Sequence, residues 1–458
     1  MLYNRPLIKN SRHTLDIRAL ASDGQGIGEL DGHRILVDGA LPGERVALKL
    51  IKVAEDYAVG RLNDVLVPSP NRIVPFCKAF RRCGGCTLQH LDYAAQCRVK
   101  TGRLRDLLAR AEWSASIPVL EMLSMSVPRR YRNKAQYPVA KVRGAVRMGL
   151  YARHSHDIIE HAECAVQPAV MTHIRDIVRD FLAERDIAIY DEGTHQGLVR
   201  YLLIRHARQT DECMVVLVVN GDGLPGRQDL IATLTEQIPN LRGILLNRNT
   251  QVTNSILGPT TEVLWGAATI SDKLGDAWFD ISPHSFYQIN PQQAEILYQR
   301  VRQYADLHGG ESVFDLYCGI GTIALSLARQ AGTVYGIDSV PQAVHDAVRN
   351  AARNHVTNAE FVTGAAEQVF PDMIRRGLSA DVVVLDPPRK GCDAALLSAL
   401  AACRPKRIVY VSCYPKSLLR DLEILTRRGY RCIEIQPVDM FPHTMHVESV
   451  ANIAPADF

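Results

Sequence analysis

The C-terminal third of the chain alternates short apolar runs with helical stretches, and this alternation constrains the fold more than any other feature. The apolar runs are, in order, VFDLY, TVYGID, AEFVTG, DVVVLD, RIVYVS and YRCIEIQPVDM. Strands that alternate with helices form a mostly parallel, doubly wound sheet, which binds its ligands at the carboxyl ends of the strands. We therefore predict an α/β fold, with a Rossmann-like domain over residues 309–458.

Two further domains are expected in a chain of 458 residues, a length typical of about three domains. Residues 1–70 contain short β-like runs separated by Gly and Asp turns, which predicts a small antiparallel barrel of about five strands, similar to oligonucleotide-binding barrels. Residues 71–308 predict a central α+β domain. Apolar residues between Val166 and Ile187 have the spacing of one helix face, and strand-like runs follow, with a second helical stretch over 227–238.

The formal net charge of +4 is too small to indicate a nucleic-acid partner by itself, but two stretches are locally basic. Residues 71–110 hold nine Lys or Arg against two Asp, and residues 129–153 hold eight Lys or Arg and no acid. Tyr131 and Tyr137 lie among these cations. Cations bind phosphates and aromatic rings stack on unstacked bases, so the pattern predicts a surface that binds RNA.

The chain contains no apolar run approaching the roughly 18 residues that a membrane helix needs, and its first twenty residues lack the apolar core of a signal peptide. We therefore expect a cytoplasmic protein that does not bind a membrane. Nothing in the sequence demands a partner protein. Eleven cysteines in a chain of this kind argue against a disulfide framework and for metal, cluster or nucleophile roles.

Three cysteines are close together in PFCKAFRRCGGCTLQH, at Cys77, Cys83 and Cys86, and Cys164 in HAECAV is the candidate for a fourth ligand. Four thiolates suit either a structural zinc ion or an iron–sulfur cluster, and their spacing leaves both open. The remaining cysteines outside the α/β strand ends are expected to be buried packing residues. These are Cys97, Cys213, Cys392, Cys403 and Cys432.

The strand ends of the predicted α/β domain carry a candidate cofactor site. The first strand runs into a turn with Gly319, Gly321 and Thr322, the second ends at Asp338, and Asp386 begins the DPPR motif after a later strand. The glycines allow a ligand to approach the backbone, and a carboxylate at the second strand end can accept hydrogen bonds from ribose hydroxyls. The phosphate-binding G-x-G-x-x-G is not completed, which favours S-adenosylmethionine over a dinucleotide.

Cys413 follows the fifth strand, and the C-terminal FPHTMHVES supplies Glu448. A thiolate, a carboxylate and a methyl donor together favour methylation of a pyrimidine at carbon 5, with Cys413 as nucleophile and Glu448 as base. The thiolate needs a nearby cation, for which Lys416 and Arg389 are candidates. The target base must also leave its stack. A zinc hydrolase is less consistent with the sequence, because FPHTMHVES does not have the order of the H-E-x-x-H helix.

Eight features in order give the chain a resemblance to the RNA uracil-C5 methyltransferase family. The chain most closely resembles the bacterial 23S ribosomal RNA (uracil-5) methyltransferases, which carry an N-terminal TRAM domain and an iron–sulfur cluster. The features are the TRAM-like barrel, PFCKAFRRCGGCTLQH, YRNKAQYPV, SFYQIN, DLYCGIGT, DPPRKG, VSCYPKSLLRD and FPHTMHVES.

The resemblance implies an RNA-binding barrel, 23S ribosomal RNA as partner and methylation of one of its uridines from S-adenosylmethionine, through a covalent cysteine adduct at carbon 6. It implies the following sites: a [4Fe-4S] cluster on Cys77, Cys83, Cys86 and Cys164, an S-adenosylmethionine pocket lined by Gln288, Tyr317, Asp338 and Asp386, the nucleophile Cys413 and the base Glu448. The family often has Phe at 317, Asn at 322, Glu at 338 and Asn at 414, where this chain has Tyr, Thr, Asp and Tyr.

Two alternatives accompany this prediction. A tRNA uracil-54 methyltransferase shares the catalytic motifs, but the bacterial tRNA enzymes of the family generally lack both the TRAM domain and the cysteine cluster. A non-catalytic RNA-binding or assembly factor would share the fold, but the presence of both Cys413 and Glu448 argues against it.

Overall fold

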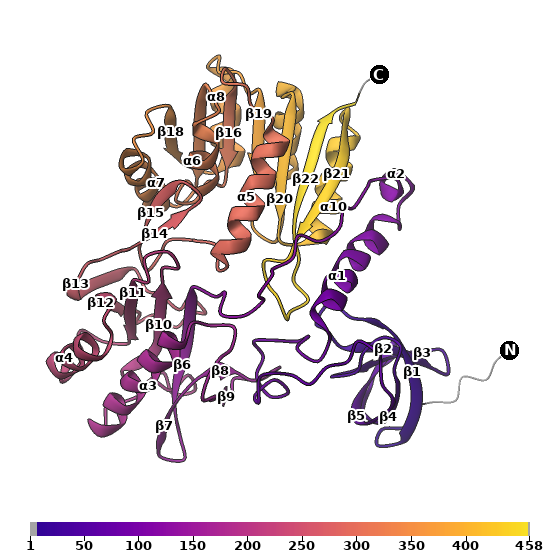
Figure 1. The fold of residues 1–458 in the computed structure, drawn as a ribbon, viewed down its shortest axis with the longest axis vertical. Helices are drawn as coiled ribbons and strands as arrows, with labels where there is room; N and C mark the ends of the chain where they lie inside the picture. The colour runs from indigo at the N-terminus through magenta and orange to yellow at the C-terminus, as the bar shows by residue number, and fades with distance from the viewer. Residues whose placement is uncertain (1–6, 457–458) are drawn as a thin grey trace.

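The computed structural model describes residues 7–456. They fold into an N-terminal barrel, a central domain and an α/β domain, and Figure 1 shows the barrel and the central domain lying below the α/β domain. The loop between the last two strands of the α/β domain extends down towards the junction of the three regions (Figure 1). This loop ends at Glu448, the predicted base.

The barrel closes with the strand order β1-β2-β3-β5-β4. Its strands are β1 (Arg12–Leu20), β2 (Gly26–Leu30), β3 (His33–Val37), β4 (Arg45–Val53) and β5 (Tyr57–Val67). The prediction of about five strands is confirmed, but the prediction of a wholly antiparallel barrel is wrong, because β3 and β5 pair in parallel. The reason is that β4 lies between β1 and β5 instead of beside β3, so the chain reverses twice before β5 closes the barrel.

The central domain contains a six-stranded sheet in the order β13-β12-β11-β10-β6-β7. Its strands are β6 (Lys134–Val142), β7 (Ala145–Met148), β10 (Val199–His206), β11 (Cys213–Val219), β12 (Leu241–Arg248) and β13 (Thr260–Gly266). The two predicted helices, α3 (Ala169–Glu184) and α4 (Arg227–Gln237), share a hydrophobic core with this sheet. A small hairpin of β8 (Leu150–Tyr151) and β9 (Ile158–Ile159) lies beside β6.

The α/β domain contains a seven-stranded sheet in the order β18-β17-β16-β19-β20-β22-β21. Its strands are β16 (Ser312–Leu316), β17 (Thr333–Asp338), β18 (Ala359–Thr363), β19 (Val382–Leu385), β20 (Arg407–Ser412), β21 (Tyr430–Val438) and β22 (Glu448–Pro455). The helices between them are α6 (Thr322–Ala328), α7 (Pro341–Arg353), α8 (Ala366–Arg375), α9 (Ala394–Cys403) and α10 (Pro415–Thr426). The predicted alternation is confirmed, with one antiparallel addition: β22 inserts between β20 and β21.

The central and α/β domains share one hydrophobic core. Helix α5 (Pro291–Ala305) packs against β20, and the hairpin of β14 (Ile270–Leu274) and β15 (Ala277–Ile281) contacts α7. Leu203 and Val216 of the central sheet belong to the same buried cluster as Val409 of β20. Helix α5 precedes residue 309, the predicted start of the α/β domain, yet it packs on the α/β sheet. The predicted bounds of the three domains therefore stay a prediction.

Helix α1 (Tyr93–Leu108), which is followed by the short α2 (Glu112–Ala115), connects the barrel side of the molecule to the α/β domain. Near the middle of α1, the Lys100 ammonium forms a 2.6 Å ion pair with Asp439, directly after β21, and both side chains are completely buried. The Tyr93 hydroxyl donates a 2.8 Å hydrogen bond to the other oxygen of Asp439. Leu104 belongs to the α/β core. Helix α1 is therefore held both by an apolar surface and by a buried charge pair.

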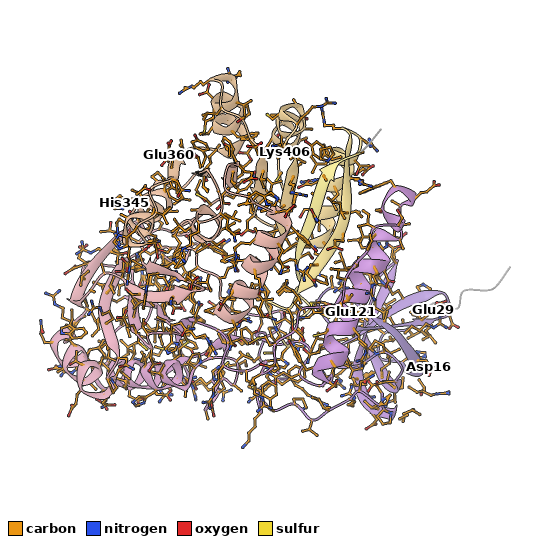
Figure 2. All side chains as sticks on the ribbon, turned by 45° about the horizontal axis from the view of Figure 1, so that its top comes forward. Asp16, Glu29, Glu121, His345, Glu360 and Lys406 are labelled. Carbon is orange, nitrogen blue, oxygen red and sulfur yellow. The ribbon has the colours of Figure 1, made fainter. Side chains whose placement is uncertain are left out.

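Charged side chains lie around the outside of the molecule. Figure 2 labels Asp16 and Glu29 on the barrel, and His345, Glu360 and Lys406 on the α/β domain. All five residues are exposed. Within residues 7–456, no helix has the length and apolar character needed to cross a membrane.

The Lys100 and Asp439 pair predicts a large stability difference between two matched substitutions. Lys100→Met leaves a buried carboxylate without its cation, which we expect to lower the free energy of unfolding by about 3–5 kcal/mol in urea titration. Lys141→Met, which breaks the exposed ion pair with Asp186, is the control and should cost under about 1 kcal/mol. Equal decreases in the free energy of unfolding of the two variants would contradict the anchoring role of Lys100.

Candidate active site

The structure brings Cys413 and Glu448 together across neighbouring strands. Cys413 directly follows β20, and Glu448 is the first residue of β22. In this antiparallel pair Ser412 lies opposite Ser449, so the same register continued by one residue places Cys413 opposite Glu448. Residues directly opposite each other in an antiparallel pair project from the same face of the sheet. The predicted nucleophile and the predicted base are therefore neighbours.

Two residues of the DPPR motif complete this group. Burial, followed by the carboxylates of Glu448 and Asp386, raises the pKa of the Cys413 thiol to about 11, whereas the Arg389 guanidinium lowers it. Burial and Asp386 also raise the pKa of Glu448 well above its usual range, and Arg389 opposes this shift. Burial raises the pKa of Asp386 to about 7. Of the two predicted cations, Arg389 therefore faces the thiol, while Lys416 lies exposed at the start of α10.

The two pKa shifts act differently: the raised pKa of Glu448 strengthens it as a proton acceptor, whereas the raised pKa of Cys413 disfavours the thiolate. Glu448 is only 3% exposed, and a carboxyl group whose pKa is raised binds a proton more tightly than an ordinary one. The negative charge of the Glu448 carboxylate disfavours the Cys413 thiolate. Arg389 then supplies the positive charge that favours the thiolate. The group therefore pairs a thiol that Arg389 helps to ionise with a carboxylate that takes up a proton readily.

The predicted cofactor turn follows β16 at the same edge of the sheet. Tyr317, Gly319 and Gly321 all have positive φ, at 72°, 55° and 83°. A Cβ placed on Gly319 would meet no atom within 4 Å, so the turn borders open space that a ligand can enter. The carboxylate of Asp338 accepts hydrogen bonds from the backbone N–H groups of Gly319, at 3.0 Å, and Val340, at 2.8 Å. Asp338 thereby fixes the turn as well as the end of β17.

Other side chains at this edge were not singled out by the sequence. Asp315 is completely buried in β16 and accepts a 2.8 Å hydrogen bond from the N–H of Ala324, near the start of α6. Burial, with Asp386 as the next cause, raises the pKa of Asp315 to about 8. The Tyr317 hydroxyl donates to Glu367 at 2.8 Å. The DLYCG motif contains Asp315 and could have identified it, whereas Glu367 in α8 has no motif of its own.

Gln288 and Thr322 are held by residues of other elements. Asn133, just before β6, donates its side-chain N–H to the backbone carbonyl of Gln288 at 2.8 Å, and its backbone N–H to Ile289 at 3.0 Å. The Thr322 hydroxyl lies 2.9 Å from the Tyr298 hydroxyl of α5. The SFYQIN motif is thereby tied to the central sheet, and the cofactor turn is tied to α5.

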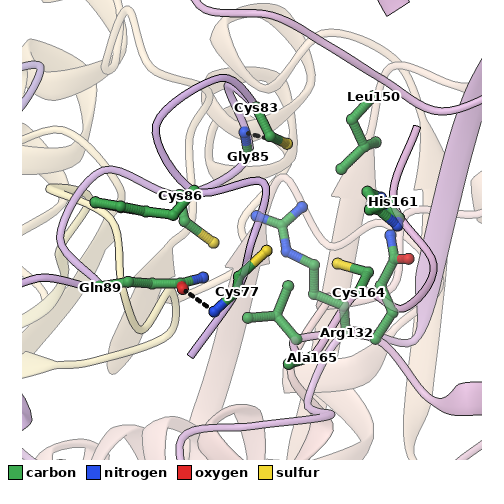
Figure 3. A pocket seen from close by; sticks show the side chains of 13 residues that line it. Cys77, Cys83, Gly85, Cys86, Gln89, Arg132, Leu150, His161, Cys164 and Ala165 are labelled. Atoms are coloured by element: carbon green, nitrogen blue, oxygen red, sulfur yellow. Dashed lines mark hydrogen bonds between the residues drawn. The ribbon is translucent and has the colours of Figure 1, made fainter. Parts of the chain in front are cut away.

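Figure 3 shows the pocket that contains the four predicted ligand cysteines. Cys77, Cys83, Cys86 and Cys164 all line this pocket, and so does Arg132. The sulfurs of Cys77, Cys86 and Cys164 point towards its centre, near the Arg132 guanidinium (Figure 3). Burial raises the pKa of Cys86 to about 12 and that of Cys164 to about 11, and Arg132 lowers both.

All four cysteines line one pocket with the Arg132 cation, and three of them are buried while Cys77 is partly exposed, a donor set that suits a group that binds thiolates. In the part of the chain that the structure describes, no three Cys, His, Asp or Glu side chains are grouped as ligands of a single metal ion. The assignment of these cysteines as ligands and the identity of the bound group both stay predictions.

Two aromatic residues predicted to contact RNA lie in the interior instead. Tyr131 is 2% exposed and donates to the carbonyl of Pro442, and Tyr137 is fully buried and donates to Gln167. The prediction that their rings stack on bases is therefore wrong. In β6, alternate residues face opposite sides of the sheet, so Tyr137 points into the core formed with α3 while Lys134 and Gln136 lie on the other face. Lys100 of the basic stretch is also buried.

Comparisons with known proteins found relatives over nearly the whole chain. Residues 269–453 match the family described as tRNA (Uracil-5-)-methyltransferase, and residues 9–62 match the TRAM domain. An uncharacterized RNA methyltransferase of Clostridium tetani is 44% identical over 445 residues, which cover 97% of this chain and 96% of that protein. An uncharacterized RNA methyltransferase of Halalkalibacterium halodurans is 44% identical over 446 residues, which cover 97% of each chain.

A solved structure is similar over nearly the whole chain. The tRNA (uracil-54, C5)-methyltransferase of Pyrococcus abyssi, in complex with S-adenosyl-L-homocysteine, is 28% identical with a TM-score of 0.78. The similarity covers 96% of this chain and 100% of the archaeal one.

The charges around Cys413 predict how its alkylation depends on pH. Since the thiol pKa is raised to about 11, the thiolate fraction and the rate of iodoacetamide labelling should rise about tenfold per pH unit between pH 7 and 9. Arg389→Gln removes the cation that lowers this pKa and should slow labelling several-fold at each pH. Lys416→Gln is the matched control and should label like the wild type. Mass spectrometry of the Cys413 peptide measures the rate, and a rate independent of pH would contradict the assignment.

Proposed function

The chain belongs to the S-adenosylmethionine-dependent RNA (uracil-5-)-methyltransferase family with an N-terminal TRAM domain, and we propose that it methylates carbon 5 of a specific uridine in 23S ribosomal RNA. The observation that carries the proposed mechanism is the position of Cys413 opposite Glu448, with Asp386 and Arg389 beside them. A nucleophile and a base on one face of the sheet are what methylation of this carbon requires.

In the proposed reaction, the Cys413 thiolate forms a bond to carbon 6 of the uracil, and the electrons of the carbon 5 to carbon 6 double bond move towards carbon 5 and the carbonyl oxygen. S-adenosylmethionine, held at the proposed cofactor site, would supply an electrophilic methyl group to carbon 5, and its sulfonium sulfur would keep the electron pair of the broken bond. Glu448 then accepts the proton of carbon 5, the double bond forms again and the bond to the Cys413 sulfur breaks. The raised pKa of Glu448 suits it to accept this proton.

The strand ends around the cofactor turn are the proposed site for S-adenosylmethionine. Gly319, Gly321 and Thr322 would allow close backbone approach, and Asp338 lies at the end of the neighbouring strand. Gln288, Tyr317 and Asp386 are proposed to line the same site. The open space beside Gly319 and the position of Asp386 next to the Cys413 and Glu448 pair support this proposal.

We propose that Cys77, Cys83, Cys86 and Cys164 hold a [4Fe-4S] cluster. Their shared pocket and the Arg132 cation within it support the proposal, since a cluster with four thiolates carries negative charge. The cluster would supply a fixed link between the loop of residues 77–86 and the segment at Cys164. No step of the methylation needs to pass through it.

A tRNA substrate is the second candidate, and the archaeal structure favours it. That protein is named a tRNA (uracil-54, C5)-methyltransferase, and all of its chain is covered by the similarity. The barrel and the cysteine segment therefore do not by themselves distinguish ribosomal RNA from tRNA. The motif resemblance to the bacterial 23S enzymes supports ribosomal RNA. A non-catalytic RNA-binding factor is disfavoured by the placement of Cys413 opposite Glu448.

RNA that contains 5-fluorouridine tests the reaction. Fluorine at carbon 5 cannot leave as a proton, so wild-type protein with S-adenosylmethionine should form an adduct with 23S ribosomal RNA fragments that survives denaturing electrophoresis. Cys413→Ala should form none. Glu448→Gln should accumulate an adduct even with natural uridine, because the proton of carbon 5 is not removed.

Bulk tRNA with the same substitution is run in parallel. An adduct with tRNA and none with 23S ribosomal RNA would show that tRNA, the second candidate, is the substrate. An adduct that persists in Cys413→Ala would contradict the mechanism.

The iron and sulfide content of the purified protein tests the proposed cluster. Protein purified without oxygen should contain about four iron and four sulfide per chain. Cys164→Ser should lose most of both, whereas Cys403→Ser, outside the pocket, should keep them. Stoichiometric zinc without sulfide in the wild type would contradict the cluster.

A further inference from the structure

Besides the cysteine pocket, the central domain contains a pocket lined by aromatic side chains. No sequence motif indicates this pocket. We call it the aromatic pocket and define it by Tyr151, His156, Tyr190, Glu192, Arg200 and Tyr201. It measures about 550 Å³, within the range of pockets that bind small ligands. It lies between the β8 and β9 hairpin, the start of β10 and the loop that follows β12.

The rings of this pocket are arranged as a stacking surface. Tyr151 and His156 stack with ring centroids 4.9 Å apart and planes inclined by 25°. On the buried side, the Arg200 guanidinium lies over the Tyr190 ring at 4.5 Å. The Tyr151 and Tyr201 hydroxyls lie 3.3 Å apart. Aromatic rings and arginine planes of this kind are the surfaces on which proteins stack unpaired RNA bases.

Polar groups in the pocket can bind the edge of a base. Glu192 has an exposed carboxylate that accepts hydrogen bonds from the Tyr151 and Tyr201 hydroxyls, both at 3.3 Å, and lies 2.9 Å from His156. Arg200 is only 7% exposed, and it donates to the backbone carbonyls of Asn249 and Gln251. Its Nε–H group is buried without a hydrogen-bond partner among the described residues. The site therefore offers an acceptor in Glu192 and donor capacity in Arg200.

The pocket lies on the sheet face that also contacts the SFYQIN motif. Tyr201 and Arg205 are on the same face of β10, about 13 Å apart along the strand. Arg205 donates to the carbonyl of Ser285, in the SFYQIN motif. On the neighbouring strand, Lys134 lies opposite Arg205 and Pro138 lies opposite Tyr201, with the partly exposed Gln136 between them. The pocket and the contact to the SFYQIN motif thus lie on one face of the sheet.

From these contacts we infer that the aromatic pocket binds an unstacked nucleobase of the RNA substrate, one close in sequence to the methylated uridine but distinct from it. The inference rests on the proposed function, because it requires RNA as substrate. Moving a uridine out of its stack also deprives its neighbours of a stacking partner. A second aromatic site on the protein replaces that partner and sets which strand conformation reaches Cys413.

Single-stranded 15-nucleotide RNAs with a central uridine test the inference. Each carries the fluorescent base 2-aminopurine at one of the flanking positions in turn. Wild-type protein should change the fluorescence at one flanking position by at least about twofold, as stacking on the protein alters emission. Tyr151→Leu should abolish that change and weaken binding about tenfold, the loss expected for one stacked base. His156→Ala removes an exposed ring and should give a smaller loss in the same direction.

Trp278→Leu is the matched control, because it removes a partly exposed aromatic ring outside the pocket. It should keep both the affinity and the fluorescence change. Wild-type affinity and fluorescence in Tyr151→Leu and His156→Ala would overturn the inference, and so would an equal loss in Trp278→Leu.

The two proposals fail in different ways. If the wild type forms the 5-fluorouridine adduct but no flanking 2-aminopurine responds, the pocket assignment is wrong and the function stands. The opposite result is also informative. If the wild type changes the fluorescence of a flanking base and Tyr151→Leu abolishes that change, but no adduct forms, the pocket binds RNA and the proposed reaction is wrong.

Discussion

The buried ion pair between Lys100 and Asp439 is the contact on which the geometry of the candidate active site depends. Two fully buried charges at 2.6 Å tolerate little displacement, because either charge alone in the interior is costly. Asp439 begins the loop that joins β21 to β22, and Glu448 ends it. Gln96, one turn before Lys100 in α1, accepts a hydrogen bond from the backbone N–H of His443. Helix α1 therefore fixes the start and the middle of the loop that delivers the proposed base.

The same loop joins the cysteine pocket to the α/β domain. The backbone N–H groups of Thr87 and Leu88, directly after Cys86, donate to the carbonyl of His443. Tyr131, beside Arg132 of the cysteine pocket, donates to the carbonyl of Pro442. These hydrogen bonds tie the segment after Cys86, and Tyr131, to the middle of the loop that ends at Glu448. In this account the pocket stabilises the arrangement of the active site and takes no part in the chemistry.

The sequence predicted the strands that are continuous apolar runs, because the buried parallel strands β16, β17, β19 and β20 contain few polar residues. It did not predict β22, where Glu448, Ser449 and Asn452 interrupt the apolar pattern. Cys413 and Glu448 could be selected by residue type, but their adjacency follows from the register of that unpredicted strand. Tyr137 was assigned to an RNA surface because its neighbours are basic, whereas strand alternation turns it inward. The aromatic pocket combines residues from separate segments, which sequence spacing cannot reveal.

The central claim is that Cys413 and Glu448 together methylate carbon 5 of a uridine in ribosomal RNA. Its most direct measurement is the transfer of labelled methyl groups from S-adenosylmethionine to purified 23S ribosomal RNA and bulk tRNA, with the modified nucleoside and its position identified by mass spectrometry. The account predicts 5-methyluridine at a defined position of the ribosomal RNA, absent with Cys413→Ala. Methylation confined to tRNA, at another atom of the base, or undiminished in Cys413→Ala would contradict it.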